Sequence, residues 1–323
     1  MEITVGTFNL NNLFSRYNFR GEIREIRAGN TEVDSSVEYR FTDAETYRIR
    51  TYMGRLVRGK PPRQRTTIAN RIRNMNIDVL AVQEVEDIDT LKRFARDDLG
   101  GLYRYHVLVE GNDPRLIDLG VLSKLPIGCI TSWQQAVHPD DVTTTVFGRD
   151  LLEVEILNPA RSRTLFTLYN NHLKSHFVPY GQDPVAGARA ANQRRRRQAE
   201  MIARIVEGQM RLNSRYVVLG DMNDPPNSRP LRPLVRSEGL NLTNALAHAH
   251  ETRPLTRDPS GPATAVWTHR FRPSGQPAEY ELYDQIWVSA ALAHRQIEAW
   301  IDRRRNLTGD GSDHDPAWIK LNL

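Results

Sequence analysis

Residues 216–224 read YVVLGDMND, a short apolar run that ends in two carboxylates and an amide. The run Tyr216–Leu219 has the length and composition of a buried β-strand. An alternating strand would place polar side chains on both of its faces, whereas Asp221, Asn223 and Asp224 crowd the exit of this one. We therefore interpret the stretch as a buried strand that delivers polar groups to one point.

Polar residues follow strand-length apolar runs at four other places in the chain. With the first stretch included, these groups are Asn9 with Asn11, Glu84, Asn171 with His172, Asp221 with Asn223, and Asp284 with the sequence SDHD at 312–315. Taken singly, each group has an ordinary structural explanation, because Asx residues are common in turns and an isolated histidine is most often a hydrogen-bonded structural residue. Five such groups in one chain favour a shared functional site.

Apolar spacing predicts helices between the strands. One begins at Thr66 or Thr67, either of which is a candidate cap, and the others are expected at Asp87–Leu99 and Asn192–Met210. Strands are predicted, in addition to the one at 216, at Ile3–Phe8, Asp78–Val85, Tyr105–Val109, Leu119–Leu122, Ile127–Trp133, Leu151–Ile156, Leu165–Asn171, Thr264–His269, Leu282–Val288 and Ala317–Leu321.

The predicted strands extend from residue 3 to residue 321 without an internal repeat or an obvious linker. A single domain that spans residues 1–323 is the simplest account of this distribution. Residues 15–65 are polar and rich in Arg, Glu and Tyr, so we interpret them as an insertion into that domain.

The composition predicts a soluble globular protein with a modest preference for anionic partners. Hydrophobic residues make up 39% of the chain, enough for a sizeable core, and 44 Lys and Arg against 39 Asp and Glu give a net charge of +5. The single cysteine, Cys129, lies in an apolar stretch and is expected to be a small buried hydrophobic residue. With no signal peptide and no run of membrane-spanning length, a cytoplasmic location is the default expectation.

The five polar groups suit the attack of water on a phosphate ester. That reaction needs oxygen ligands for Mg²⁺, a base for the water and hydrogen-bond donors for the charge that develops on the phosphoryl oxygens. The sequence has neither the paired Cys and His spacing of a zinc site, nor a P-loop, nor a G-x-S-x-G elbow. Metal-assisted hydrolysis of a phosphate ester is therefore the chemistry that the residues favour.

An ordered series of motifs resembles the endonuclease/exonuclease/phosphatase superfamily, which includes deoxyribonuclease I and the apurinic endonucleases of the exonuclease III type. The matching stretches are TFNLNNLF at 7–14, VLAVQEV at 79–85, GVLSKLPI at 120–127, NNHLKS at 170–175, GDMND at 220–224, YDQIWVS at 283–289 and SDHDP at 312–316. Each motif alone is weak evidence, but their order covers nearly the whole chain. The resemblance implies an α/β fold, a four-layer α/β sandwich in which two packed, mixed, mostly antiparallel sheets are flanked by helices.

The resemblance also implies a role for each site residue. Glu84 would be the main Mg²⁺ ligand, with Asn9, Asn11 and Asp313 close to the same ion or to a second one. Asp221 would deprotonate the attacking water, Asn223 and His172 would donate hydrogen bonds to phosphoryl oxygens, His314 would contact the scissile phosphate, and Asp284 would orient His314. Mn²⁺ or Ca²⁺ are possible substitutes or second ions. Position 11 is Asn where some members of the family have Asp, so the site lacks one possible anionic ligand.

Basic residues favour nucleic acid as the substrate. Arginine and lysine recur in the insertion (Arg50, Arg55, Arg58, Lys60, Arg63 and Arg65), at Arg194–Arg197 and at Arg303–Arg305, although each run could equally be a solvated surface. Lys174, in a His-x-Lys-Ser variant similar to that of bacterial nucleases of the superfamily, and Arg149 are further candidates for phosphate contact. No interleaved aromatic platform for single strands is visible, so we expect duplex DNA to be bound through its backbone with low sequence specificity.

Two alternatives remain open at the level of the sequence. The same catalytic set would serve a phosphomonoesterase or a lipid phosphodiesterase with a different rim around the pocket. A binding module that retains phosphate affinity without turnover is the second alternative, and the presence of a competent residue at every catalytic position argues against it.

Overall fold

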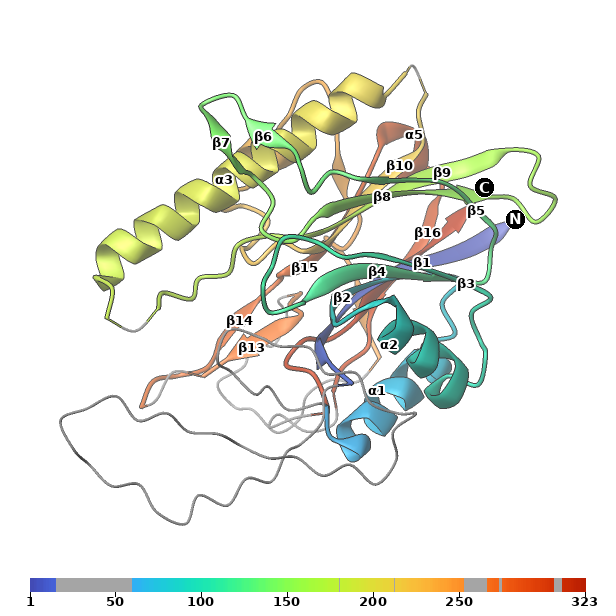
Figure 1. Cartoon of the computed structure of the whole chain (residues 1–323). Coiled ribbons are helices and arrows are strands. Elements are labelled where there is room, and N and C mark those ends of the chain that lie inside the picture. The colour runs from blue at the N-terminus through green and yellow to red at the C-terminus, as the bar shows by residue number, and fades with distance from the viewer. Residues whose placement is uncertain (16–59, 180, 212, 253–265, 273–274, 305–309) are drawn as a thin grey trace, which may run out of the picture.

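Two mixed β-sheets pack face to face at the centre of the molecule (Figure 1). The computed structural model describes residues 1–15, 60–179, 181–211, 213–252, 266–272, 275–304 and 310–323. One buried apolar cluster joins the inner faces of the sheets, with Val5 and Val121 from the first sheet and Leu168 and Val217 from the second. Because strands alternate their side chains, each sheet also has an apolar outer face that helices cover.

The first sheet has seven strands. In spatial order they are β12 (His250–Glu251), β16 (Gln296–Ile301), β17 (Ala317–Asn322), β1 (Glu2–Leu13), β2 (Val79–Val85), β4 (Asp118–Ser123) and β3 (Tyr105–Val109). The second sheet has six, in the order β11 (Thr243–Asn244), β15 (Asp284–Val288), β10 (Tyr216–Asp221), β9 (Thr164–His172), β8 (Leu151–Leu157) and β5 (Ile127–Ser132). Two small hairpins, β6 (Val137–His138) with β7 (Asp141–Thr145) and β13 (His269–Phe271) with β14 (Glu279–Glu281), lie outside the sheets.

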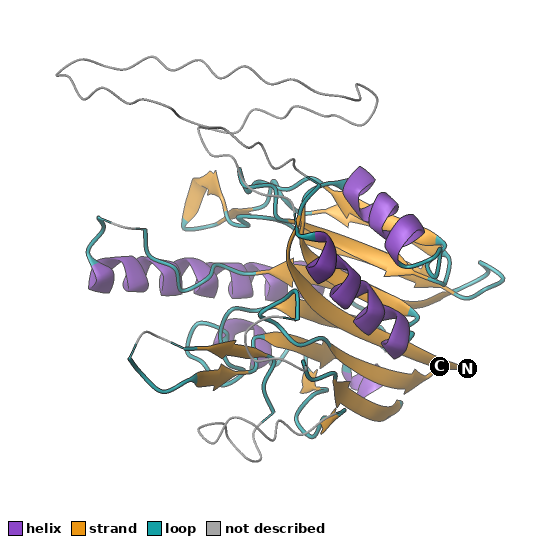
Figure 2. Cartoon of the chain, turned by 90° about the horizontal axis from the view of Figure 1, so that it is seen from below, coloured by secondary structure: helices purple, strands orange, loops and turns teal. Residues whose placement is uncertain are grey.

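Helices cover the outer faces of both sheets, which confirms the predicted four-layer sandwich (Figures 1 and 2). Helix α3 (Pro184–Gln209) lies over the second sheet, where Ile202 and Val206 join its outer apolar cluster. Helices α1 (Pro62–Met75) and α2 (Ile88–Arg93) pack on the first sheet, and a π-helical turn at Phe94–Asp98 extends α2. The remaining helices, α4 (Arg232–Val235) and α5 (Ala290–Ala293), are single turns.

Each sheet has a parallel pair of strands at its centre, and a second parallel pair, β12 with β16, lies at the edge of the first sheet. Strands β1 and β2 are parallel and α1 lies between them in the chain, while β9 and β10 are parallel and α3 lies between them. The carboxyl ends of a parallel pair meet at the same edge of a sheet, and the register places His172 opposite Asp221. Strand β15 runs antiparallel to β10 and places Asp284 opposite Asp221. The topology therefore gathers the predicted polar groups at one end of the sandwich.

The first and last strands of the described chain are neighbours. Strand β1 pairs antiparallel with β17 from Glu2 opposite Asn322 to Thr7 opposite Ala317, and the two termini lie side by side (Figure 2). The amino group of Met1 donates a hydrogen bond to the carbonyl of Leu323 at 2.7 Å. Both ends of the chain thus belong to the same sheet.

Two predicted helix starts are wrong. Helix α1 begins at Pro62, not at a threonine cap, because proline at the first turn needs no N–H partner and has a backbone angle suited to the helix. Helix α3 begins at Pro184, before the predicted Asn192, and the Asp183 side chain caps it by accepting a hydrogen bond from the Ala186 amide. Sequence periodicity identified the helical faces but not these starts.

Three further predictions need correction or lie outside the described residues. Cys129 is exposed, because it lies on β5, which is the edge strand of the second sheet. The strand predicted at Thr264–His269 begins only at His269, and residues 264 and 265 are outside the described part. Most of the predicted insertion also lies outside it, but its flanks meet, since the Lys60 amide donates to the Phe14 carbonyl at 3.2 Å.

Within the described ranges, none of the helices has the length and apolar character required to cross a bilayer.

Candidate active site

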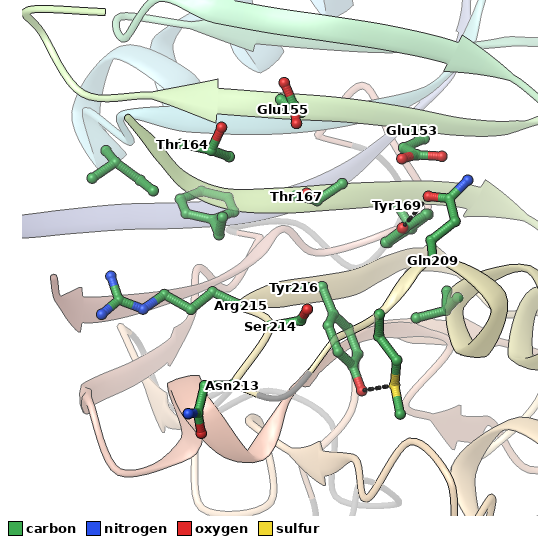
Figure 3. A pocket seen from close by; sticks show the side chains of 14 residues that line it. Glu153, Glu155, Thr164, Thr167, Tyr169, Gln209, Asn213, Ser214, Arg215 and Tyr216 are labelled. Carbon is green, nitrogen blue, oxygen red and sulfur yellow. Dashed lines mark hydrogen bonds between the residues drawn. The ribbon is translucent and has the colours of Figure 1, made fainter. Parts of the chain in front are cut away.

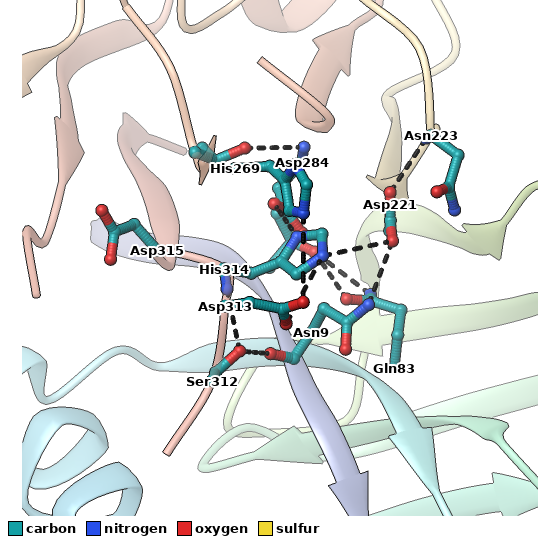
Figure 4. A network of polar contacts seen from close by, with 12 residues as sticks. Asn9, Gln83, Asp221, Asn223, His269, Asp284, Ser312, Asp313, His314 and Asp315 are labelled. Atoms are coloured by element: carbon teal, nitrogen blue, oxygen red, sulfur yellow. Dashed lines mark hydrogen bonds and ion pairs between the residues drawn. The ribbon is translucent and has the colours of Figure 1, made fainter. Parts of the chain in front are cut away.

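The ends of β1, β2, β9, β10 and β15 deliver their polar side chains to one buried cluster (Figure 4). Asp221 is at its centre and is only 1% exposed. The Oδ2 atom of Asp221 accepts a hydrogen bond from Nδ2 of Asn9 at 3.0 Å and faces Nε2 of His172 at 3.4 Å and Nε2 of His314 at 3.8 Å. The structure thus brings together residues from four separate regions of the chain, as the sequence predicted.

His314 and Asp284 form a tightly paired dyad beside Asp221. Nδ1 of His314 lies 2.6 Å from Oδ2 of Asp284, and both side chains are buried. Burial alone would lower the pKa of His314, but the carboxylates of Asp284 and Asp221 outweigh that effect and raise this pKa to about 10. His314 is therefore an imidazolium at neutral pH, with Nε2 directed toward Asp221.

His172 has the opposite protonation state. Burial lowers the pKa of His172 well below its ordinary range, and the positive charges of Arg149 and His314 add to the effect. Its Nδ1 atom is buried and has no hydrogen-bond partner among the described residues, so we assign the single ring proton to Nε2. The site therefore contains one charged and one neutral imidazole, both with Nε2 near the Asp221 carboxylate.

The surroundings of Asp221 raise the pKa of its carboxylate. Burial raises the pKa of Asp221, the charge of His314 lowers it, and Asp284 raises it again, with a net rise. A carboxylate with a raised pKa is a better match for accepting a proton from water near neutral pH. Gly220, which precedes it, has a φ angle of +131°, and a Cβ there would lie 2.0 Å from the carbonyl oxygen of Asn171. This close approach of β9 and β10 requires glycine next to the central carboxylate.

Asn223 lies in a tight turn and not on an extended chain as the sequence suggested. Its φ angle is +51°, and its backbone N–H donates to Oδ1 of Asp221 at 2.9 Å. Its side-chain Nδ2 donates to the carbonyl of Leu173 at 3.1 Å. The Asx turn brings Asn223 beside Asp221 and fixes one oxygen of the carboxylate, leaving Oδ2 for His172, His314 and Asn9.

Glu84 is held in a strained backbone conformation at the end of β2. Its φ angle is +62°, which is uncommon for a residue other than Gly or Asn, and the register of β2 with β1 shifts at this point. Oε2 of Glu84 accepts a hydrogen bond from the backbone of Asn12 at 3.0 Å, and Oε1 lies 3.5 Å from Nδ2 of Asn9 and 3.9 Å from Nε2 of His172. The bulge thus turns the Glu84 carboxylate out of the sheet and into the site.

The residues around Glu84 fit a hard divalent cation. Burial raises the pKa of Glu84 and the negative charge of Asp313 adds to the rise, which indicates repulsion between two carboxylates that a cation would relieve. Asn11 donates from Nδ2 to Oδ1 of Asp313 at 2.7 Å, and its backbone N–H donates to Oδ1 of Asn9 at 2.9 Å. Glu84, Asn9, Asn11 and Asp313 therefore form the all-oxygen set that Mg²⁺ prefers.

Two other groups of acidic and imidazole side chains have the spacing of a metal site. They are His269 with Asp313 and His314, and Asp221 with Asp284 and His314. Both depend on His314, whose raised pKa keeps its ring protonated and leaves it without a lone pair for a metal. In this protonation state His314 is unsuited to bind a metal, so neither group is complete.

Three residues near the site were not predicted from the sequence. His269 packs its ring 4.8 Å from that of His314 and stacks on Tyr283 at 5.0 Å. Ser312 donates from Oγ to the Asn9 carbonyl at 2.7 Å and so holds the SDHD segment against β1. Lys60, expected only as part of a surface run, donates from Nζ to the Gly311 carbonyl at 2.5 Å in the field of Glu84 and Asp313. Ser312 lies within the SDHD segment and Lys60 in a basic run, but no sequence pattern places either of them or His269 at the site, because tertiary structure brings each one there.

The two predicted phosphate contacts, Arg149 and Lys174, lie beside the end of β9 that carries His172. Arg149 is 5% exposed, with Nε 3.2 Å from Oδ2 of Asp113 and Nη1 donating to the Leu173 carbonyl at 3.1 Å. Lys174 lies just beyond the end of β9, and its Nζ donates to the carbonyls of Ser175 and Phe177. Both are close to the catalytic cluster, since Arg149 acts on the pKa values of His172 and Lys174.

Several of the predicted basic surface residues are structural instead. Arg303 and Arg304 are buried and pair with the buried Asp315 at 3.3 Å and 3.0 Å. Arg195 is fully buried and pairs with Asp224 at 2.8 Å. These arginines satisfy buried carboxylates and present no charge to a ligand. Arg305, Arg50, Arg55 and Arg58 lie outside the described residues.

An open pocket of about 420 Å³ lies at the opposite ends of the same strands (Figure 3). Thr164 at the start of β9, Tyr216 at the start of β10 and Gln209 at the end of α3 line it. The pocket lining on β9 runs from Thr164 to Tyr169 and so ends three residues before His172, roughly 10 Å away along the strand. The pocket is therefore separate from the polar cluster at the carboxyl ends of the strands.

The chain belongs to the endonuclease/exonuclease/phosphatase family, whose model matches residues 6–314. Members of this family are hydrolases that act mostly on phosphodiesters or phosphomonoesters, and the site described above has the groups for such a reaction. No curated protein shows a significant sequence match.

Solved structures with the same fold include proteins named for different substrates. An AP endonuclease from Archaeoglobus fulgidus matches with a TM-score of 0.57 and 15% identity over 99% of this chain and 100% of its own. A mannosyl-6-phosphatase from Bacteroides thetaiotaomicron matches with a TM-score of 0.56 and 13% identity over 99% of this chain and 100% of its own. TDP2 of D. rerio, complexed with a single-strand DNA product, matches with a TM-score of 0.56 and 11% identity over 100% of this chain and 99% of its own. At these identities the likeness establishes the fold alone.

Proposed function

We propose that this protein is a divalent-metal-dependent nuclease that hydrolyses phosphodiester bonds, with duplex DNA as the expected substrate and low sequence specificity. The observation that carries this proposal is the position of Asp221 between a charged His314 and a neutral His172, with the Glu84 carboxylate 3.9 Å from the same neutral ring. This set offers a base, two donors and a metal ligand around one small space, as hydrolysis of a phosphate ester requires.

Asp221 accepts the proton of the attacking water through Oδ2. Asn9 holds that oxygen from one side with a 3.0 Å hydrogen bond, and the Asx turn with Asn223 holds the other oxygen, so the carboxylate cannot rotate away. The neutral His172 does not compete for the proton, because its pKa is well below its ordinary range. Asp221 is therefore the base best placed to activate the water.

His314 stabilises the charge that builds on a non-bridging phosphoryl oxygen. Its Nε2–H carries a full positive charge at neutral pH because Asp284 holds the other nitrogen. The Nε2–H of His172 donates to a second oxygen, and Arg149 adds positive charge behind it. These donors are fixed before substrate binds, which is the condition for effective electrostatic stabilisation.

Mg²⁺ bound by Glu84 with Asn9, Asn11 and Asp313 would supply a Lewis acid for the phosphate oxygens. The preference for nucleic acid is supported by Arg149 and Lys174, two cations near the end of β9 that carries His172. Duplex DNA would be held there through its phosphates and not through its bases.

Nicking of supercoiled plasmid tests the proposal directly. The protein, its His314→Ala variant and a control variant at the exposed His248, His248→Ala, are compared with Mg²⁺ and with EDTA. We expect open-circular and linear DNA only with Mg²⁺, and only from the wild-type and control proteins. Faster hydrolysis of p-nitrophenyl phosphate than of DNA and of bis(p-nitrophenyl) phosphate would overturn the nuclease assignment and indicate a phosphomonoesterase.

A further inference from the structure

Three cationic residues from separate elements lie around the end of β9, the strand that carries His172. Arg149 precedes β8, Lys174 follows β9, and Arg194 lies in the first half of α3. Arg149 donates to the carbonyl of Leu173, the residue directly before Lys174, at 3.1 Å. Nη2 of Arg194 lies 3.4 Å from the position that a Cβ would take on Gly148, the residue directly before Arg149. The side chains of Arg149 and Arg194 thus lie against the backbone segments that carry Lys174 and Arg149, respectively.

Buried contacts with α3 fix this arrangement. Arg195 donates to the Lys174 carbonyl and pairs with Asp224, and Oε1 of Gln198 accepts from the Lys174 amide at 2.9 Å. The inward face of the helix thus holds the segment that carries Lys174, while the neighbouring Arg194 remains exposed. The helix serves as a rigid support for the cationic group.

The three charges have few opposite charges to balance them. Asp113 pairs with Arg149, but in the part of the chain that the structure describes neither Lys174 nor Arg194 has a carboxylate within ion-pair distance. Burial lowers the pKa of Lys174 to about 8, and the positive charges of Arg149, Arg195, Arg115 and Arg194 contribute to the shift. Like charges that converge beside a phosphate-binding centre are stabilised when an anion binds between them.

We infer that Arg149, Lys174 and Arg194 form a subsite for the phosphate that neighbours the scissile one. The Cα atoms of His172 and Lys174 are two residues apart and so at most about 7 Å from each other, a separation that suits successive phosphates of one strand. The substrate class is then a polymer of phosphodiesters and not an isolated phosphate ester. This inference rests on the proposed nuclease function and specifies which substrates the same site selects.

A DNA strand with one neutral linkage tests the subsite. A short synthetic strand, end-labelled and offered both single and in duplex, carries one uncleavable methylphosphonate at its centre, and the cut positions are read on a gel. We expect cleavage at the linkage on one side of the methylphosphonate to fall about tenfold relative to remote linkages in the same molecule. Equal cleavage next to and far from the neutral linkage, with the unmodified strand cut normally, overturns the subsite and leaves the nuclease function intact. No cleavage of the unmodified strand overturns both.

Variants on α3 assign the effect to the subsite. Arg194→Met is compared with Arg204→Met, a control on the same helix whose guanidinium pairs with Glu200 at 2.8 Å. With Arg194→Met we expect the slope of log(kcat/KM) against log[salt] on duplex DNA to lose about 0.9. Cleavage beside the neutral linkage should also be reduced less than with the wild-type protein. The control should retain the wild-type slope. A slope in Arg194→Met equal to that of the control would contradict the assignment.

Discussion

Asp284 and His314 are joined by a 2.6 Å contact in which both partners are buried, and the other nitrogen of the same ring faces the central carboxylate. The contact links β15 to the segment before β17, and so joins the two sheets at the site. Because Asp284 stabilises the charged ring, it decides whether this imidazole can act as a cationic donor.

The substitution Asp284→Asn should lower the pKa of His314. The carboxylate raises that pKa to about 10, so its neutral isostere removes a main cause of the rise and the ring loses its charge at a lower pH. We expect a fall of at least about one to two units, measured by NMR titration of the metal-free protein. An unchanged His314 titration would mean that other groups hold the charge.

The substitution Asn11→Asp should make the fold more dependent on metal. It replaces a donor 2.7 Å from the Asp313 carboxylate with a second carboxylate, so repulsion should lower the melting temperature without metal by about 2–4 °C. With Mg²⁺ the new carboxylate becomes a metal ligand. The rise in melting temperature that Mg²⁺ causes should therefore be larger in the variant than in the wild type. Thermal melts with and without Mg²⁺ measure both effects, and Asn158→Asp, in a distant loop, is the control. If Mg²⁺ raised the melting temperature of the variant by the same amount as that of the wild type, position 11 would lie outside the metal site.

The substitution Gly220→Ala should destabilise the protein by about 3 kcal/mol or more. The added Cβ would overlap the Asn171 carbonyl at 2.0 Å, and the backbone angle of +131° is unsuited to alanine. Gly208→Ala is the matched control, because no atom lies within 4 Å of its Cβ position and alanine favours the helix that contains it. Urea unfolding measures both free energies. Equal stability of the two variants would show that β9 and β10 can separate at this point.

The substitution Asp118→Asn should stabilise the protein more at pH 8 than at pH 5. Burial raises the pKa of Asp118 from 3.8 to about 7, so the folded state binds a proton more tightly than the unfolded state does. The free energy of unfolding therefore falls as the pH rises from about 4 to about 7. The asparagine side chain does not ionise, so the variant does not lose this stability. We expect the gain at pH 8 to exceed that at pH 5 by about 2 kcal/mol in urea unfolding. The same gain at both pH values would contradict a buried carboxylate that ionises with difficulty.

The strand ends were predictable from the sequence because each carries its own local pattern. An apolar run followed by Asp221 or Glu84 indicates a buried strand and its polar exit without knowledge of the rest of the chain. The convergence of these ends follows from the parallel pairing of β1 with β2 and of β9 with β10, which the structure shows.

Features that depend on long-range contacts were not predictable. The arginine run at 194–197 resembles a surface patch, yet Arg195 is fully buried because Asp224 lies opposite it after folding. His269 has no pattern around it, and only the hairpin that carries it brings its ring to His314. Cys129 lies in an apolar stretch that would be buried in a central strand but is exposed at an edge. In each case a distant partner decides the environment.

The pairing of β1 with β17 has a consequence for the order of folding. The sheet that begins at Glu2 is completed only when Asn322 is available, and Asp313 and His314 lie just before that last strand. A chain that is still being synthesised therefore leaves β1 unpaired on one side and lacks the dyad partner of Asp284. Contacts of such long range slow folding, and they also delay the onset of hydrolysis until the carboxyl-terminal strand has emerged and docked.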